Sequence, residues 1–145
     1  MEIKEIDISD ISSIIPAYIS YYNEQENSCW TEATAKKRIC QVLTTQDSYG
    51  LIMKDKDITV GFVMGYFKQY DDIQSYFLEE ILIATEYQNK GYGSALLKEI
   101  ETRVINKGAS CIEMQAVSDE LHEHYYGKAG YHNAKNFVMK VKWFE

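Results

Sequence analysis

The chain has 145 residues, of which 46% are hydrophobic and 26% are charged, and its formal net charge at pH 7 is −7. This composition is typical of a folded globular chain and excludes a disordered one. The acidic balance argues against a nucleic-acid partner, because binding to phosphate backbones requires clustered lysine and arginine. No linker rich in proline, glycine or serine interrupts the sequence, and we therefore expect residues 1–145 to form a single domain.

Membrane insertion and disulfide bonding are not indicated. No apolar run approaches the roughly 18 to 20 residues that a membrane-spanning helix needs, and the N-terminus lacks the pattern of a signal peptide. The three cysteines, Cys29, Cys40 and Cys111, lie far apart and form no CxxC motif. This spacing predicts neither a disulfide framework nor a zinc site. We therefore expect reduced thiols and a cytoplasmic protein with no membrane partner.

The first half of the chain predicts a strand, two helices and a hairpin. Ile3–Ile8 alternates apolar and charged residues, as in a strand with one solvated face. Asp10 is a candidate N-cap for a helix whose apolar residues follow helical spacing. A second helix begins after Thr31, although Thr34 stands where a full capping box has glutamate. Two apolar runs around a polar turn within Leu51–Phe67 predict a β-hairpin.

The second half alternates strands and helices. Ser75–Ile83 is predicted to be a strand, and Gly91–Lys107 carries the apolar stripe of a helix that ends at Gly108. The remaining predicted elements are a strand over Cys111–Val117, a helix over Glu120–Ala129 and a final strand over Phe137–Phe144. The resulting order is strand, helix, helix, three strands, helix, strand, helix, strand. This order is typical of a mixed α/β fold.

The most informative segment is Gln88–Gly93, a turn with two glycines between a strand and a helix. Unpaired amides at a helix N-terminus, together with the helix dipole, favour bound anions such as phosphates. The segment lacks the GxxxxGK[ST] pattern of a P-loop, and Leu96 stands where a dinucleotide fingerprint has its third Gly or Ala. The sequence therefore predicts a site for a different phosphate carrier.

Gln88-Asn89-Lys90-Gly91-Tyr92-Gly93 is similar to the Q/R-x-x-G-x-G/A motif of the GNAT superfamily of acetyl-CoA-dependent N-acyltransferases. The predicted order of elements also agrees with this family across essentially the whole chain. Tyr125–Tyr131 resembles the family's F-Y-x-K-x-G-F segment, and Leu78–Ile83 resembles the acidic strand of its diamine and polyamine acetyltransferases. The resemblance implies a GNAT fold, with a mixed central sheet in which the fourth and fifth strands splay apart.

The resemblance also implies acetyl-CoA as the co-substrate. Backbone amides of residues 89–94 would hold the pyrophosphate, while Lys90 is either an additional cation or a solvated surface lysine. The main chain of the fourth strand would pair with the pantetheine arm. The implied acetyl-CoA residues are Ile81, Leu82, Ile83, Gln88, Asn89, Lys90, Gly91, Tyr92, Gly93 and Ser94. Asp119 stands where the family often has an asparagine that contacts the pantetheine, and is a further candidate.

Acetyl transfer to a primary amine needs a base for the ammonium and an acid for the departing thiolate. Tyr126 matches the family's general acid, and a phenol with an ordinary pKa of about 10 can donate at neutral pH; packing alone would also explain Tyr126. Glu79 matches the general base of the polyamine enzymes, with Glu80 as an acceptor-binding group or alternative base. Alternation along a strand predicts that these two side chains point to opposite faces.

The acceptor is expected to be a small cationic amine, attracted by charge and by cation–π contacts. The acidic and aromatic residues behind this expectation are Tyr21, Tyr22, Glu24, Glu26, Trp30, Tyr70, Asp71 and Asp72, although solvated loops would explain the same residues. The alternative function is a non-catalytic CoA-binding sensor or regulatory domain.

No metal is expected, because His122 and His124 would share a face only in a strand and their segment is predicted to be helical. An exposed final strand over Phe137–Glu145 would allow two copies to pair as a homodimer, as exposed edges in this family often do.

Overall fold

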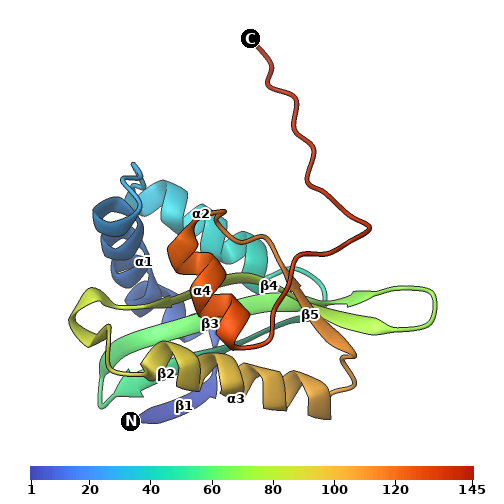
Figure 1. Ribbon diagram of the computed structural model, residues 1–145. Coiled ribbons are helices and arrows are strands. Elements are labelled where there is room, and N and C mark those ends of the chain that lie inside the picture. Colours follow the sequence, from blue (N-terminus) through green and yellow to red (C-terminus); the bar gives the residue numbers. More distant parts are fainter. The chain divides into compact units, whose positions relative to one another are not determined.

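The computed structural model describes residues 1–145 and contains two compact units, Met1–Gln115 and Ala116–Glu145, which we call the N-terminal and C-terminal units. The N-terminal unit holds five strands and three helices (Figure 1). Its elements are β1 (Glu2–Glu5), α1 (Ile11–Gln25), α2 (Glu32–Leu43), β2 (Ser48–Asp55), β3 (Ile58–Gln69), β4 (Gln74–Ile83), α3 (Tyr92–Asn106) and β5 (Cys111–Met114). The mixed α/β class is confirmed, but the predicted order is incomplete, because two 3-10 turns, Ile8–Asp10 and Thr85–Tyr87, are added.

The strands form one sheet in the order β1-β2-β3-β4-β5. Neighbours from β1 to β4 are antiparallel, whereas β4 and β5 are parallel. The ladder between β4 and β5 starts at Ser75 and ends where Leu78 pairs with Met114. β3, in contrast, pairs with β4 as far as Ile83. The half of β4 from Glu79 to Ile83 therefore has no strand on its β5 side.

A β-bulge interrupts the pairing of β3 with β4. Met64 pairs with Glu80 and the next residue, Gly65, pairs with Leu78, so that Glu79 has no partner residue on β3. Only glycine fits at position 65, since a Cβ atom there would lie 2.0 Å from the Phe77 carbonyl oxygen. A bulge re-aims the side chains next to it. This one sets the direction of the two glutamates.

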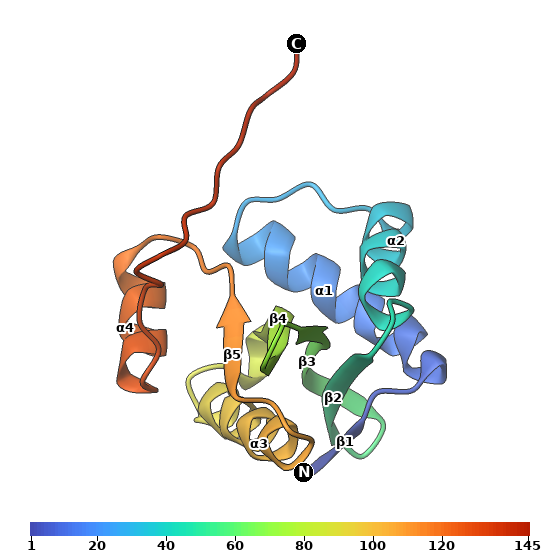
Figure 2. The ribbon, with the colours of Figure 1, turned by 90° about the vertical axis from the view of Figure 1, so that its right-hand side faces the viewer.

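Helices cover both faces of the sheet, with α1 and α2 on one face and α3 on the other (Figure 2). The core under α1 and α2 joins Ile14, Tyr18 and Ile39 of the helices to Phe62 and Leu82 of the sheet. On the opposite face, α3 buries the apolar stripe predicted from its spacing, Leu96, Leu97, Ile100 and Val104. Helices therefore pack against the sheet on both of its faces.

α1 and α2 begin directly after Asp10 and Thr31, as predicted, but their capping hydrogen bonds differ from the prediction. Asp10 forms no cap hydrogen bond to α1; its carboxylate accepts from the Asp7 N–H at 2.8 Å and pairs with Lys54 Nζ at 3.3 Å. Thr31 and Thr34 form a complete capping box at α2, because the Thr34 hydroxyl accepts from the Thr31 N–H at 2.9 Å as a glutamate would. The predicted C-terminus of α3 is confirmed, since Gly108 follows it with a φ of 102°.

The C-terminal unit contains α4, Glu120–Lys128, which confirms the helix predicted there. The strand predicted over Phe137–Phe144 is wrong, because residues 137–144 have no regular secondary structure. Alternation fixes which side chains share a face, but a strand also needs a partner for its N–H and C=O groups. The C-terminal unit holds no other strand.

Neither unit contains a helix that is both long enough and apolar enough to cross a membrane.

Candidate active site

The turn between β4 and α3 has the backbone geometry that its glycine motif predicts. Gly91, the N-cap of α3, has a φ of 85°, and Asn89 has a φ of 61°. Both residues lie in the left-handed region, which glycine enters at no steric cost. The Gln88 side-chain amide donates to the Ile83 carbonyl at 3.0 Å. The first residue of the motif thus ties the turn to the end of β4.

The backbone of this turn presents a row of unused donors. The N–H groups from Asn89 to Ser94 donate to no other group of the protein, and the first bond of α3 runs from Ala95 N–H to the Gly91 carbonyl at 3.1 Å. The helix dipole adds about half a positive charge at this end. A Cβ atom at Gly91 would meet nothing within 4 Å. The turn therefore offers donors, positive potential and open space to an anion such as a phosphate.

Lys90 adds a cation beside these donors. Its Nζ lies 5.8 Å from the centre of the Tyr87 ring, and the rings of Tyr87 and Tyr92 are 6.2 Å apart. The lysine is exposed and forms no ion pair. A cation–π contact of this kind holds the ammonium near the turn while leaving it available to an anion.

The strand segment predicted to carry the pantetheine, Ile81–Ile83, lies in the half of β4 with no neighbour on the β5 side. The side chains of Leu82 and Ile83 are buried and that of Ile81 is half-buried. These side chains serve the core, and only the main chain is open to a ligand. The Ala84 N–H donates to the Val60 carbonyl, so alternation along the antiparallel ladder directs the N–H and C=O of Leu82 toward β3 and those of Ile81 and Ile83 away from it. Because the Ile83 carbonyl already accepts from Gln88, the free groups of this edge are the N–H and C=O of Ile81 and the N–H of Ile83.

Glu79 and Glu80 both reach the same guanidinium. Arg38 Nη2 lies 3.1 Å from Glu79 Oε1 and 3.3 Å from Glu80 Oε1, and Arg38 Nε lies 3.4 Å from Glu80 Oε1. The prediction that the two glutamates point to opposite faces is therefore wrong. Its physical reason is the bulge: Glu79 is the extra residue, and the two-residue alternation of a regular strand does not apply across it.

Two tyrosines of α1 complete the surroundings of Glu80. The Tyr18 hydroxyl donates to Glu80 Oε1 at 3.2 Å, and the Tyr22 hydroxyl donates to Glu80 Oε2. Burial raises the pKa of Glu80, although Tyr22, Arg38 and Tyr18 act in the opposite direction. Burial and the charge of Glu80 also raise the pKa of both tyrosines, which keeps them protonated as donors.

Glu79 differs from Glu80 in its free accepting capacity. Its side chain is 26% exposed, against 10% for Glu80. Only its Oε1 atom has a hydrogen-bond partner, whereas both carboxylate oxygens of Glu80 are occupied. Glu79 Oε2 is therefore the carboxylate oxygen that can take a proton or a hydrogen bond from a ligand.

Arg38 and Tyr18 are members of this cluster that the sequence did not indicate. Arg38 is 41 residues from Glu79, and no local pattern links the two. Tyr22, predicted near the acceptor, does lie in the cluster, and its spacing of four residues from Tyr18 places both on one helix face. Trp30, also predicted there, packs edge-on against Tyr18 with ring centres 5.0 Å apart.

Tyr70, predicted to lie near the acceptor, instead contacts Glu113 of β5. Its hydroxyl lies 2.9 Å from both carboxylate oxygens of Glu113, and the Ser75 hydroxyl donates to Glu113 Oε1 at 2.6 Å. Ser75 is at the start of the β4–β5 ladder, whereas Glu80 lies beyond its end. Tyr70 thus fastens the β3–β4 hairpin to β5 rather than lining the glutamate cluster.

Two further predicted site residues, Tyr126 and Asp119, belong to the C-terminal unit. The Tyr126 ring packs edge-on against Tyr125 and Tyr131, with ring centres 4.9 Å and 5.8 Å apart. Asp119 is the N-cap of α4: its Oδ1 accepts from the His122 N–H at 2.8 Å and lies 2.7 Å from His122 Nδ1. The hydrogen bond from the His122 N–H has the largest effect on the pKa of Asp119 and lowers it, and the contact with His122 Nδ1 lowers it further. The carboxylate is therefore used for helix capping.

No group of three or more His, Cys, Asp or Glu side chains is arranged to hold a metal ion. The three cysteines are free.

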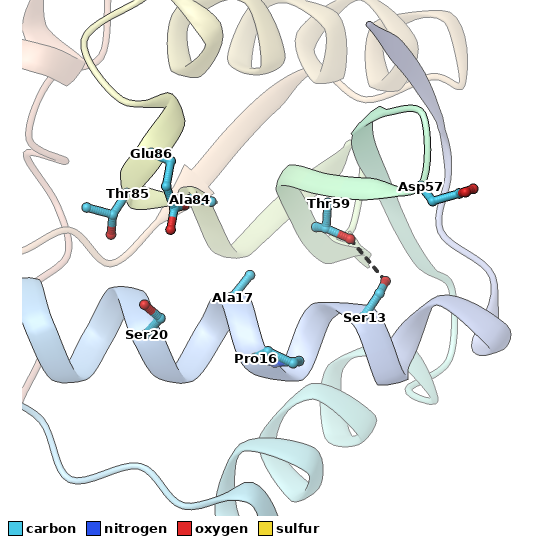
Figure 3. A pocket seen from close by; sticks show the side chains of 9 residues that line it. All are labelled: Ser13, Pro16, Ala17, Ser20, Asp57, Thr59, Ala84, Thr85 and Glu86. Carbon is cyan, nitrogen blue, oxygen red and sulfur yellow. Dashed lines mark hydrogen bonds between the residues drawn. The ribbon is translucent and has the colours of Figure 1, made fainter.

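A cavity of about 390 Å³ lies between α1 and the ends of β3 and β4 (Figure 3). Ser13 and Ser20 of α1, Thr59 of β3 and Thr85 of the following turn give it a hydroxyl-rich lining. The Thr59 hydroxyl donates to that of Ser13 at 3.0 Å. None of the predicted site residues lines this cavity, so it is distinct from the glutamate cluster.

The sequence profile of the acetyltransferase (GNAT) domain matches residues 18–143. The match includes the glycine turn, the glutamate pair and α4. The chain therefore belongs to the GNAT acetyltransferase family, whose members use acetyl-CoA. Comparison of the sequence with curated proteins finds no match.

Solved structures of acetyltransferases share the fold. A possible acetyltransferase from Clostridium difficile 630 has a TM-score of 0.82 at 15% identity, over 99% of this chain and 98% of that chain. A ribosomal-protein-alanine N-acetyltransferase from Brucella melitensis biovar Abortus 2308 has a TM-score of 0.74 at 17% identity, over 99% of this chain and 98% of that chain. An aminoglycoside N-acetyltransferase in complex with CoA has a TM-score of 0.74 at 13% identity, over 97% of this chain and 93% of that chain.

Proposed function

We propose that the chain transfers an acetyl group from acetyl-CoA directly to a primary amine, and that the acceptor is a small cationic amine, bound through its positively charged ammonium group. One feature of the N-terminal unit supports this function above all. A turn of unused amides lies at one end of the open β4 edge, and the Glu79–Glu80 pair lies at the other end of the same edge. A thioester arm along this edge would keep its phosphates at the turn and bring its acyl end to the carboxylates.

The residues present fit both polar parts of acetyl-CoA, which supplies the acetyl thioester. The amides of Asn89–Ser94, with Lys90, would hold the pyrophosphate. The free main-chain groups of Ile81 and the Ile83 N–H would pair with the pantetheine amides as an added strand does. A backbone N–H of β4 would donate to the thioester oxygen as negative charge develops there. Asp119 is less suited to the pantetheine, because its carboxylate caps α4.

Glu79 is the proposed general base, acting on the acceptor ammonium directly or through a water molecule. Its Oε2 has no partner in the protein and its side chain is more exposed than that of Glu80. Glu80 accepts from Tyr18, Tyr22 and Arg38 and has little capacity left for a proton from the acceptor. Its proposed role is to position Arg38 and to add negative charge for a cationic acceptor.

Tyr126 is the proposed general acid for the departing thiolate. Tyr126→Phe, which removes only the hydroxyl, is expected to lower kcat about 100-fold at neutral pH, within the range for general acid catalysis. The matched control is Tyr125→Phe on the same helix, whose ring packs against that of Tyr126 at 4.9 Å. Equal kcat values for Tyr126→Phe and Tyr125→Phe at several pH values would remove Tyr126 from the mechanism.

Residues 1–145 are proposed to act as one domain, because the family match runs through both units. The three free cysteines support a reducing compartment, the cytoplasm, as the place of action.

Calorimetry and turnover together test the function. Acetyl-CoA is expected to bind saturably, and a panel of primary amines is expected to contain at least one acceptor whose acetylation releases CoA. If calorimetry shows no saturable binding at millimolar acetyl-CoA, the proposed function is wrong. Binding without turnover of any amine would favour the alternative, a CoA-binding sensor or regulatory domain.

A further inference from the structure

Given the function proposed above, we propose that the acceptor carries a carboxylate next to a single ammonium group, as an α-amino acid does, and that Arg38 binds this carboxylate. Arg38 would then determine acceptor specificity in a site whose base is Glu79. The acidic sequence of β4 resembles that of diamine and polyamine acetyltransferases. On this proposal, however, a diamine or polyamine would be a poor acceptor.

Charge balance in the cluster favours one ammonium group. Glu79 and Glu80 bring two negative charges when ionised, and Arg38, in contact with both, brings one positive charge. Tyr18 and Tyr22 stay neutral because their pKa values are raised. The three charged side chains therefore sum to one net negative charge, which a zwitterionic α-amino acid leaves unchanged and a diamine would reverse to one net positive charge. A second ammonium would lie near the guanidinium without a carboxylate of its own.

Arg38 keeps donors for a ligand. A guanidinium has five N–H donors in a planar fork. The single donor on Nε and the donors on Nη2 are directed at the two glutamates, whereas Nη1 makes no hydrogen bond. The Arg38 side chain is 29% exposed. Nη1 is therefore the guanidinium nitrogen left for a ligand carboxylate when both glutamates stay in place.

The two atoms that remain available to a ligand, Glu79 Oε2 and Arg38 Nη1, belong to side chains that contact each other. Glu79 Oε1 lies 3.1 Å from Arg38 Nη2, so the free Oε2 of Glu79 and the free Nη1 of Arg38 belong to one ion pair. An α-amino acid has its ammonium and carboxylate on one carbon and would use both positions. The amide or ester of the same amino acid would contact only Glu79 Oε2, through its ammonium group. It would lose the charge-assisted hydrogen bond between a carboxylate and Arg38.

The test compares three acceptors of similar size, an α-amino acid, its amide and a diamine, with the full-length wild type, Arg38→Gln and Arg38→Lys. For the wild type, kcat/KM is expected to be about 10- to 100-fold higher for the acid than for the amide, the value of one charged hydrogen bond. Arg38→Gln is expected to erase this preference and to favour the diamine, because the cluster then carries two net negative charges. Arg38→Lys, which keeps the charge but loses the fork, is expected to discriminate against the diamine and to lose part of the preference for the acid.

The control is Arg103→Gln on α3, since Arg103 is also in an ion pair, 2.9 Å from Glu99, and is 31% exposed. It is expected to keep the wild-type ratios. Ratios between acceptors are unaffected by a partly unfolded sample, and thermal unfolding identifies a variant that has lost its fold. A wild type that prefers the amide or the diamine, or that acetylates none of the three while binding acetyl-CoA, overturns the inference; so does an Arg38→Gln variant with unchanged ratios. Absence of acetyl-CoA binding instead overturns the proposed function.

Discussion

The two halves of the candidate site, the turn from Gln88 to Ser94 and the cluster around Glu80, are built from different parts of the chain. The turn uses main-chain N–H groups of consecutive residues, and its shape follows from the left-handed conformation of Gly91. The cluster uses side chains from α1, α2 and β4. A site of main-chain donors depends on backbone conformation, whereas a site of side chains depends on each functional group. Substitutions of the two kinds should therefore separate the two halves.

The largest effect is expected from Glu79→Gln, which keeps the shape of the side chain and its hydrogen bond to Arg38 but removes the base. We expect kcat to fall about 100- to 10,000-fold, while the Kd for acetyl-CoA measured by calorimetry stays unchanged. Glu99→Gln on α3, where the carboxylate pairs with Arg103, is the control and should retain wild-type kcat. A kcat for Glu79→Gln within a factor of two of the wild type would transfer the role of base to another group.

A smaller effect is expected from Gly91→Ala at the turn. An alanine at a φ of 85° is strained, and relief of that strain would turn the N–H donors away from a phosphate. We expect the KM for acetyl-CoA to rise about 10-fold, equivalent to a penalty of one to two kilocalories per mole, with little change in kcat.

Gly108→Ala is the matched control for this substitution. Gly108 has a φ of 102° and stands at the opposite end of the same helix. Its replacement should lower the stability of the protein comparably and leave the KM for acetyl-CoA unchanged. Equal KM values for the two alanine variants would show that the turn does not bind the co-substrate.

The smallest effect is a pH dependence of stability that separates Glu80 from the buried Asp10. Burial raises the pKa of Glu80 above its ordinary value of 4.5. The folded state then binds more protons than the unfolded state, so the stability contributed by Glu80 falls as the pH rises from 4.5 to the raised value. The free energy of unfolding of the wild type, relative to that of Glu80→Gln, should therefore decrease over this range in denaturation experiments.

Asp10 should show the opposite sign. Burial acts to raise its pKa, but the Asp7 N–H, Lys54 and Lys4 outweigh burial and lower it below its ordinary value of 3.8. Its contribution is complete above that value and is lost as the pH falls through the lowered pKa. The wild type should thus lose stability relative to Asp10→Asn in acid. If both carboxylates shift stability in the same direction, burial does not raise the pKa of Glu80.

Local patterns predicted the elements well where neighbours in sequence decide the structure. The apolar stripe of α3, its Gly108 terminus and the turn before it all follow from residues within one or two helical turns. The pattern failed at Phe137–Phe144, where alternation was present but no partner strand was. At Asp10 the pattern predicted the N-cap position of α1 correctly but not the contact of the carboxylate, which pairs with Lys54 of β2 instead of capping the helix.

The candidate site also has one half that follows from local sequence and one half that depends on distant segments. The sequence by itself determined the main-chain half, because glycine spacing dictates backbone conformation and the helix N-terminus supplies the donors wherever the fold places it. Only the tertiary structure decided the side-chain half. The bulge opposite Met64 and Gly65 placed Glu79 and Glu80 on one guanidinium, and the packing of α1 and α2 brought Tyr18, Tyr22 and Arg38 to them. Strand register and helix packing depend on contacts between distant segments, which no local pattern encodes.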